Sequence, residues 1–382
     1  MRWPQYAIVV VGAIPMPESR TVLVAAGGTG GHVFPALAVA ESLRADGIDV
    51  IWLGTQRGLE SRVVVDAGFR LEYIDVIGIR GKGLFSALVA PFKLLRAVFQ
   101  VMGLLRREKP LCVLGMGGFV SAAGGLAAAC LRVPLILQEQ NAVAGTTNRY
   151  LAPLAKRVFT GFPGVFAGRR NAQYSGNPLR AAFYDLDVPE QRLQRGDNEC
   201  RLLVLGGSQG AAMLNSWMPQ VCAEATAEMS ATELKLVVRH QAGQAQVDEV
   251  ESAYRDGGVN ATVEPFIEDM PSAYCWADLV LARSGALTVS ELTAVGVAAL
   301  LVPFPAATDN HQRHNAEFLV VEGAARRMDQ GTTQPADVLA SLLELLRDRT
   351  QLCRMAVSAR RLAMPNATRE IAHACAGVPH AS

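Results

Sequence analysis

The chain has 382 residues, of which 50% are apolar and 19% are charged, and its formal net charge is +1. This length predicts two globular domains, since one domain takes about 100–200 residues. The near-zero charge excludes a chain that binds nucleic acid through its overall electrostatics, and no run of about 18 apolar residues indicates a transmembrane helix. The seven cysteines form no CxxC and no metal-binding spacing, which is typical of free thiols in a reducing compartment.

Residues 1–20 precede the first regular pattern in the chain. Arg2 followed by the apolar stretch 7–14 resembles a secretory signal, but the stretch is short and no small-x-small cleavage site follows it. We expect residues 1–20 to be an extension that is disordered, touches a membrane surface, or is not translated if Met16 is the true start.

Apolar strands alternate with amphipathic helices from residue 21 onward. A strand at 21–25 leads into Gly27-Gly-Thr-Gly-Gly-His32, and a helix from about 33 to 45 and a strand at 50–53 complete a βαβ unit. The loop lacks the GK[ST] of a P-loop, and neither its glycine spacing nor the residues after the second strand fit a dinucleotide site. We interpret it as backbone that lets a ligand approach closely, with His32 at its rim.

The next segment, 78–110, is basic and amphipathic. It holds seven Lys or Arg residues against Glu108 alone, a local charge of +6. Such a stretch predicts peripheral contact with anionic lipid. The alternative is a core-facing helix with a solvated basic rim. The predicted membrane residues share one apolar stripe: Leu84, Phe85, Leu88 and Phe92.

Two further turns end strands of the same predicted sheet. A strand at 111–114 leads into Gly115-Met-Gly-Gly-Phe-Val-Ser121, and a strand at 134–137 leads into Gln138-Glu-Gln-Asn-Ala-Val-Ala-Gly145. Both turns should meet the His32 loop at the carboxyl edge of the sheet. Asn177-Pro178 marks a hinge. In the charged, turn-rich segment 185–199, we interpret Asp185-Leu-Asp187 as solvated charge and not as a metal site.

A second βα series begins at Arg201, and three of its turns carry small or polar residues. They are Gly206-Gly-Ser-Gln-Gly210, Arg283-Ser-Gly-Ala-Leu-Thr-Val-Ser-Glu291 and Asp309-Asn-His-Gln312. The second turn opens a helix that Gly296 should stop. The N–H groups of such a helix start suit a phosphate. Thr288 can add a hydroxyl, and the Glu291 carboxylate can accept both hydroxyls of a ribose. The alternative is that Thr288-x-x-Glu291 is a capping box.

Taken together and in order, these motifs resemble the MurG family over about residues 21–375. The resemblance rests on Ala26-Gly-Gly-Thr-Gly-Gly-His32, Gly115-Met-Gly-Gly-Phe-Val-Ser121, Glu139-Gln-Asn141, Gly176-Asn-Pro-Leu-Arg180, Gly206-Gly-Ser-Gln-Gly210 and Ser284-Gly-Ala-Leu-Thr-Val-Ser-Glu291. It implies an α/β GT-B fold, with two Rossmann-like doubly wound parallel-sheet domains facing a central cleft. After the extension 1–20, residues 21–178 would form the acceptor- and membrane-binding domain, against which a C-terminal helix at about 365–382 packs back. Residues 179–364 would bind UDP-GlcNAc.

The resemblance also implies an activity. Members move N-acetylglucosamine from UDP-GlcNAc to the C4 hydroxyl of undecaprenyl-diphospho-MurNAc-pentapeptide (lipid I), with inversion, to give lipid II. No metal or other cofactor is implied. The expected place is the cytoplasmic face of the inner membrane, as a peripheral protein. Anionic lipids and cell-wall synthesis proteins are expected partners, and nucleic acid is not.

Site residues follow from the resemblance position by position. His32 and Glu139 would be catalytic. Two departures from the family pattern, Gln138 in place of His and His311 in place of the first Gln of a Gln-Gln pair, bear on the sugar contacts. The donor would contact Thr29, Gly30, Gly31, Asn141, Arg180, Ser208, Ile267, Ala286, Leu287, Thr288, Val289, Ser290, Glu291 and Gln312.

The catalytic base and the reaction class each leave alternatives open. His32 is the favoured base, because a neutral imidazole suits proton removal near neutral pH and a helix start disfavours imidazolium. Glu139 is the competitor, and His32 as a helix cap is the third interpretation. A UDP-GlcNAc 2-epimerase and a non-enzymatic nucleotide-sugar sensor remain as alternatives to a transferase.

Overall fold

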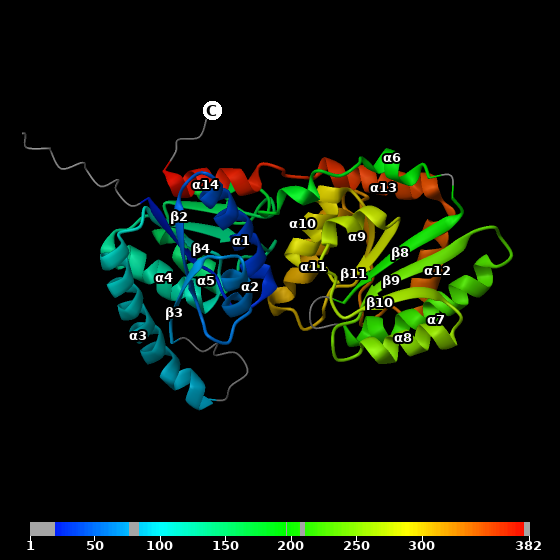
Figure 1. Cartoon of the computed structure of the whole chain (residues 1–382), viewed down its shortest axis with the longest axis horizontal. Coiled ribbons are helices and arrows are strands. Elements are labelled where there is room, and N and C mark those ends of the chain that lie inside the picture. The colour runs from blue at the N-terminus through cyan, green and yellow to red at the C-terminus, as the bar shows by residue number, and fades with distance from the viewer. Residues whose placement is uncertain (1–19, 76–83, 196, 207–210, 378–382) are drawn as a thin grey trace, which may run out of the picture.

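The computed structural model describes residues 20–75, 84–195, 197–206 and 211–377, except the side chains of residues 84–90. Two parallel sheets lie side by side, each between layers of helices (Figure 1). These sheets confirm the predicted fold of two doubly wound α/β domains. The predicted extension 1–20 lies outside the described residues, apart from residue 20.

The first sheet has seven parallel strands in the order β3-β2-β1-β4-β5-β6-β7. Its central strands are mainly apolar because helices cover both faces, so alternate residues enter different cores. In β1, Val22 and Val24 belong to one buried cluster, and Leu23 and Ala25 to the other. The strands are β1 Thr21–Ala25, β2 Asp49–Gly54, β3 Arg70–Tyr73, β4 Cys112–Gly115, β5 Leu135–Glu139, β6 Arg157–Thr160 and β7 Ala172–Tyr174.

The helices of this domain follow its strands. The first helix begins at Gly30, three residues earlier than predicted, because Gly28 turns the chain at a φ of 93° and frees the next residues to be helical. His32 therefore lies in its first turn. The helices are α1 Gly30–Ala45, α2 Glu60–Asp66, α3 Leu84–Glu108, α4 Gly118–Leu131 and α5 Thr146–Leu151, followed by η1 Ala152–Leu154.

The second sheet has six parallel strands in the order β10-β9-β8-β11-β12-β13. The strands are β8 Glu199–Leu205, β9 Lys235–Gln241, β10 Asn260–Glu264, β11 Leu279–Ala282, β12 Ala298–Leu301 and β13 Ala325–Arg327. The helices are η2 Ala181–Phe183, α6 Pro189–Leu193, α7 Ala212–Met229, α8 Val247–Asp256, α9 Met270–Trp276, α10 Ala286–Val295, η3 Thr308–Asn310, α11 His311–Val320, α12 Pro335–Arg347 and α13 Arg349–Arg361.

The chain returns to the first domain after α13. The last helix, α14 Ala367–Ala376, packs beside α1 (Figure 1). Ile371 and Cys375 enter the core under α1. At the crossing, Thr368 Oγ1 accepts from Leu179 N at 3.1 Å and donates to Leu179 O at 2.8 Å. The terminal helix therefore ties the two ends of the first domain together.

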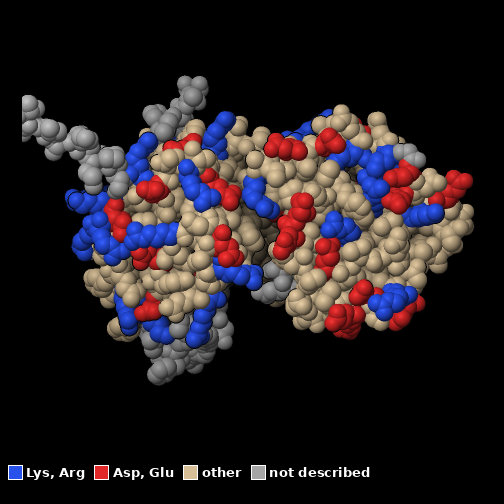
Figure 2. All heavy atoms as spheres, in the orientation of Figure 1, with Lys and Arg blue, Asp and Glu red and all other residues tan. Residues whose placement is uncertain are grey.

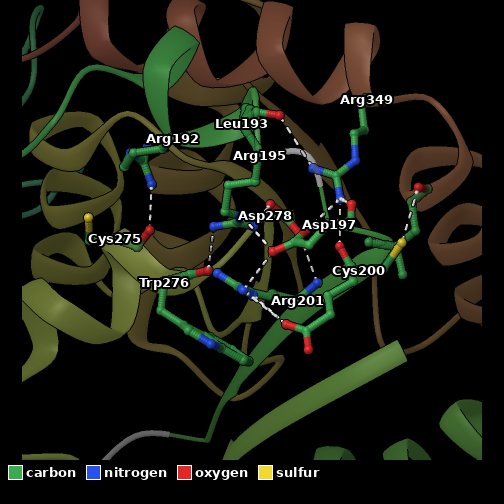
Figure 3. Close-up of polar contacts among 12 residues, drawn as sticks. Arg192, Leu193, Arg195, Asp197, Cys200, Arg201, Cys275, Trp276, Asp278 and Arg349 are labelled. Carbon is green, nitrogen blue, oxygen red and sulfur yellow. Dashed lines mark hydrogen bonds and ion pairs between the residues drawn. The ribbon is translucent and has the colours of Figure 1, made fainter. Parts of the chain in front are cut away.

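A cluster of charged side chains lies where β8 and β11 begin, at the edge of the second sheet opposite the predicted ligand edge (Figure 3). Arg195 pairs with the buried Asp278, which also accepts from Arg201 N at 2.8 Å. Arg192, on α6, is buried although it belongs to the charged segment 185–199. Its guanidinium donates to carbonyls at the C-terminal ends of two helices, at Tyr274 and Cys275 of α9 and at Val295 and Gly296 of α10.

The helix α3 has two different faces along its described part. Ala97, Val101 and Leu105 are buried in the core shared with α4. On the other face, Phe92 is 74% exposed and Phe99 is 62% exposed. Among the described helices, none combines the length and the apolar character that crossing a membrane requires.

Candidate active site

A cavity of about 1090 Å³ lies between the two domains. Its walls come from the loops at the carboxyl ends of β1, β4 and β5 in the first domain, and of β11 and β12 in the second. Nine of the residues predicted from the sequence line it: Thr29, Gly31, His32, Glu139, Asn141, Ala286, Leu287, Thr288 and Gln312. The structure thus brings the two predicted catalytic residues and the start of α10 into one space.

His32 faces this cavity with a partly enclosed ring. Its Nδ1 is buried and has no hydrogen-bond partner among the described residues. Its Nε2 lies 3.2 Å from the point where a Cβ on Gly117 would stand, so a side chain at 117 would crowd that nitrogen. Burial lowers the pKa of His32 below its usual 6.5, against the opposing effects of Glu139, the Gly27 carbonyl and Glu60. Burial therefore keeps the imidazole neutral near pH 7.

Glu139 ends β5 and is 2% exposed. One carboxylate oxygen accepts from Asn141 N at 3.1 Å and Asn141 Nδ2 at 3.4 Å. The other accepts from Gly145 N at 2.9 Å and Asn148 Nδ2 at 2.9 Å. Glu139 thus folds the loop after β5 into the cavity wall. With four donors already in place, the carboxylate is poorly placed to take a proton from a ligand.

Glu60 is a buried carboxylate that the sequence interpretation missed. It accepts from Gly28 N at 2.9 Å, and from Thr55 N and Thr55 Oγ1, both at 2.8 Å. A Cβ on Gly58 would come within 2.0 Å of its carboxylate. Glu60 therefore fixes the first glycine loop through Gly28 N, and the missing side chains of Gly54 and Gly58 leave space for its carboxylate. In the sequence, an acidic residue close to these two glycines was the only sign of this role.

The helix α10 begins at Ala286, with Gly285 as its N-cap. Thr288 is therefore the third residue of the helix and not its cap, so the capping-box alternative for Thr288 and Glu291 is wrong. The predicted end at Gly296 is confirmed, with a φ of 70° at that glycine. The N–H groups of the first turn point at the cavity, which Gly285 to Thr288 line.

Glu291 lies one turn further along α10, half-buried and outside the cavity lining. Tyr274 Oη donates to its Oε2 at 2.9 Å. Burial raises the pKa of Glu291 to about 7, although the Tyr274 hydrogen bond and the charge of Arg180 both oppose the shift. Arg180 itself is exposed. Glu291, Tyr274 and Arg180 thus form a second group beside the cavity.

The other predicted donor residues, and Gln312 of the cavity wall, differ in their surroundings. Val289 and Ile267 are buried in the core, so a ligand can reach them only through backbone, and Ile267 N already donates to Gln241 Oε1 at 3.2 Å. Gln312 accepts from Phe304 N at 2.9 Å. Gly30 is in the first turn of α1 but does not line the cavity. Ser208 lies outside the described residues, as do the side chains of Leu84, Phe85 and Leu88.

Two amides that the sequence interpretation did not assign to the site join the domains across it. Asn315, on α11, accepts from Ala142 N at 2.8 Å and donates to Asn141 Oδ1 at 3.3 Å. Asn177 donates to Gln140 O at 3.0 Å and to Ser290 Oγ at 2.9 Å. Both side chains are buried.

The departure at Gln138 belongs to this second link. Gln138 is fully buried, donates to Asn177 Oδ1 at 2.7 Å and does not line the cavity. It therefore supports Asn177, and its position does not support the expectation that this departure bears on the sugar contacts.

Comparisons with known proteins agree with this geometry. The glycosyltransferase family 28 N-terminal domain matches residues 22–160, and the family 28 C-terminal domain matches residues 201–371. A UDP-N-acetylglucosamine–N-acetylmuramyl-(pentapeptide) pyrophosphoryl-undecaprenol N-acetylglucosamine transferase of Nitrosococcus oceani is 50% identical over 354 residues, which cover 93% of this chain and 97% of that protein.

Solved structures point the same way. The crystal structure of Acinetobacter baumannii MurG is 39% identical and superposes with a TM-score of 0.79 over 94% of this chain and all of its own. A UDP-N-acetylglucosamine 2-epimerase superposes with a TM-score of 0.63 over 92% of this chain and 94% of its own, but at 14% identity, which shows the shared fold alone. The cavity, the two matched domains and these identities lead to one conclusion: the chain belongs to the MurG family, within glycosyltransferase family 28.

Proposed function

We propose that this protein transfers N-acetylglucosamine from UDP-GlcNAc to the C4 hydroxyl of lipid I, and so makes lipid II for peptidoglycan synthesis. The observation that carries the proposal is the shared cavity, to which the first domain contributes His32 and the second contributes the start of α10. The names of the relatives, at about half identity over nearly the whole chain, support the donor and the acceptor.

In the proposed reaction, Nε2 of His32 takes the proton of the acceptor's C4 hydroxyl. The freed oxygen bonds to C1 of the sugar, and the bond from C1 to the β-phosphate oxygen breaks on the opposite side. UDP leaves with that electron pair, and the anomeric carbon inverts to a β-1,4 link. The neutral imidazole is the form that the reaction needs, and burial maintains it.

Glu139 has a supporting part in this proposal. Its carboxylate is engaged by Asn141, Gly145 and Asn148, and its charge acts on His32 in the direction that stabilises imidazolium. It therefore shapes the acceptor wall and favours the protonated His32 that forms during the transfer, while Asn141 faces the sugar.

The UDP leaving group would be stabilised by the chain's own positive groups. We propose that the N–H groups at the start of α10 and the guanidinium of Arg180 bind the diphosphate, which leaves no task for a resident metal. Glu291 would hold the ribose, Ile267 the edge of the uracil through its backbone, and Gln312 the sugar hydroxyls. Transfer that continues in excess EDTA supports this; a rate restored only by Mg²⁺ contradicts it.

One incubation series separates the candidate functions. With UDP-GlcNAc alone, a transferase leaves the sugar unchanged, an epimerase converts it to the manno isomer, and a sensor only binds it. Addition of a short-chain lipid I analogue should then yield a disaccharide product and UDP in equal amounts. Sugar epimerisation without acceptor, or binding without product, would reject the proposal.

We further propose that the protein works at the cytoplasmic face of the inner membrane, bound peripherally through α3. Its exposed face carries Phe92, Leu95 and Phe99, and Lys and Arg side chains gather over the same side of the first domain (Figure 2). Apolar side chains ringed by basic ones suit an anionic surface. Replacing Phe92 and Phe99 with serine should reduce binding to anionic vesicles while turnover of a soluble acceptor persists. Unchanged vesicle binding, with Val321→Ser as the exposed control, would contradict this.

A further inference from the structure

We propose that Tyr274 is a positioning residue for the ribose of the donor, acting through Glu291. The inference rests on the proposed function, because it takes Glu291 as the residue that holds the ribose. Tyr274 is fully buried on α9, and its hydroxyl donates to Oε2 of Glu291 at 2.9 Å. No other hydrogen bond reaches the Glu291 carboxylate from the described residues.

The hydrogen bond leaves the carboxylate able to take both ribose hydroxyls. An ionised carboxylate has about four acceptor sites on its two oxygens. Tyr274 fills one site on Oε2, so one ribose hydroxyl can bind there and the other on Oε1. A protonated carboxyl loses this property, since one oxygen then becomes a donor. The ionised state of Glu291 is therefore part of the donor site.

The surroundings of Glu291 bring its ionised and protonated states to similar populations near neutral pH. Burial raises the pKa of Glu291 to about 7. Two groups counter the rise, Tyr274 from α9 and Arg180 just before η2, and no charged group of α1, α11 or α13 acts on it among the described residues. Arg180 is exposed and also acts on Asp269, so its charge is shared and screened. The Tyr274 hydroxyl is fully buried, so its hydrogen bond to Glu291 is the less screened of the two effects that lower the pKa of Glu291.

Tyr274 also keeps the proton that it donates to Glu291. Burial and the neighbouring Glu291 raise its pKa well above the usual 10, so the hydroxyl keeps its proton. The ring packs at 6.3 Å from the ring centroid of Phe183. From the far end, Arg192 donates to the Tyr274 and Cys275 carbonyls of α9 and to the Val295 and Gly296 carbonyls at the end of α10. Figure 3 shows the contact with Cys275. The spacing between the tyrosine and the carboxylate is thus set by two helices clamped together.

The test compares Tyr274→Phe with Tyr254→Phe in the full-length protein. Tyr254 is an equally buried tyrosine of the same domain, and its hydroxyl bonds to His240 Nδ1 at 2.9 Å, away from α10. Both variants lose one buried hydroxyl and keep the ring. Dissociation constants for UDP-GlcNAc, whose diphosphate diester does not titrate near neutrality, are measured by calorimetry across the neutral pH range without acceptor.

For the wild type, affinity should rise with pH through about 7 and level off above it, as Glu291 ionises. In Tyr274→Phe the midpoint should move up by about one to two pH units, the equivalent of one hydrogen bond to a charged group, and affinity at pH 7 should fall by about five- to fiftyfold. At high pH it should approach the wild-type value. Tyr254→Phe should leave the profile unmoved.

A third and fourth variant keep the inference testable if Tyr274→Phe folds poorly. Glu291→Gln should bind more weakly with no pH dependence of this kind, and adding Tyr274→Phe to it should change affinity little. The wild type should also prefer the ribose donor over its 2′-deoxy analogue, and Tyr274→Phe should narrow that preference at pH 7.

Each result counts for or against the inference. A Tyr274→Phe profile like the wild type's, an equal loss in Tyr254→Phe, or a pH dependence that survives in Glu291→Gln would overturn it. If the wild type binds UDP-GlcNAc but forms no product with lipid I, the proposed function fails and the ribose inference stands. If the wild type does not bind UDP-GlcNAc, both fail.

Discussion

At the scale of single residues, His32 is set apart by its place in the cavity wall, where a side chain at 117 would crowd its Nε2. His32→Ala should lower kcat by about 10²–10⁴-fold, the usual contribution of a general base, and leave KM for UDP-GlcNAc little changed. Because burial lowers the pKa of His32, the wild-type rate should fall only when the pH drops below that lowered value. Steady-state kinetics across pH check both points. A variant that keeps its kcat and loses donor affinity would make His32 a binding residue.

Glu139 should respond differently, because its carboxylate holds a loop. In the wild type, Gly145 N and Asn148 Nδ2 both donate to one carboxylate oxygen of Glu139. In Glu139→Gln, an NH2 group at that position is itself a donor, so it cannot accept these hydrogen bonds. The variant should lose about 1–3 kcal/mol of unfolding free energy, the cost of buried donors left unpaired, together with activity. Chemical denaturation beside His32→Ala provides the comparison. A fully stable Glu139→Gln with no activity would instead point to proton transfer by Glu139.

At the scale of elements, the buried Arg192 connects α6 with the ends of α9 and α10. Arg192→Met keeps most of the side-chain volume but leaves several buried carbonyls without a donor. We expect a loss of at least about 1–3 kcal/mol in unfolding free energy. Arg255→Met is the matched control, since Arg255 is 71% exposed in a helical pair with Glu251 and should cost only about 0.3–0.5 kcal/mol. Equal losses in the two variants would show that the hydrogen bonds of Arg192 to α9 and α10 do not contribute to stability.

At the scale of the whole molecule, Asn315 connects the second domain to the loop after β5. Two of its hydrogen bonds cross the cleft, to Ala142 N and Asn141 Oδ1, each contributing about 1 kcal/mol. Asn315→Ala should favour an open arrangement, seen as a larger radius of gyration in small-angle scattering, with a lower transfer rate. Asn198→Ala, at an exposed site, is the control. A radius of gyration equal to the wild type's would show that other contacts keep the domains closed.

The fold and the outline of the site follow from sequence because their signals are local. Apolar strands, glycine turns and helix starts recur within short windows, and parallel strands bring their carboxyl ends to one edge. This was enough to predict the two sheets, the end of α10 at Gly296 and the meeting of the His32 loop with the turns after β4 and β5. The order of the motifs was enough to identify the family.

Other features depend on partners far apart in the chain, and only the tertiary structure decided them. The bonds of Asn315 span 173 and 174 residues, that of Glu60 to Gly28 spans 32, and that of Tyr274 to Glu291 spans 17. No local pattern marks such a residue, because its partner is chosen by how the elements pack. The same holds for ionisation: the lowered pKa of His32 and the pKa of about 7 at Glu291 arise mainly from burial. The sequence by itself therefore determined which elements form and which chemical groups they carry, whereas the packing of those elements decided which groups meet and in which charge state.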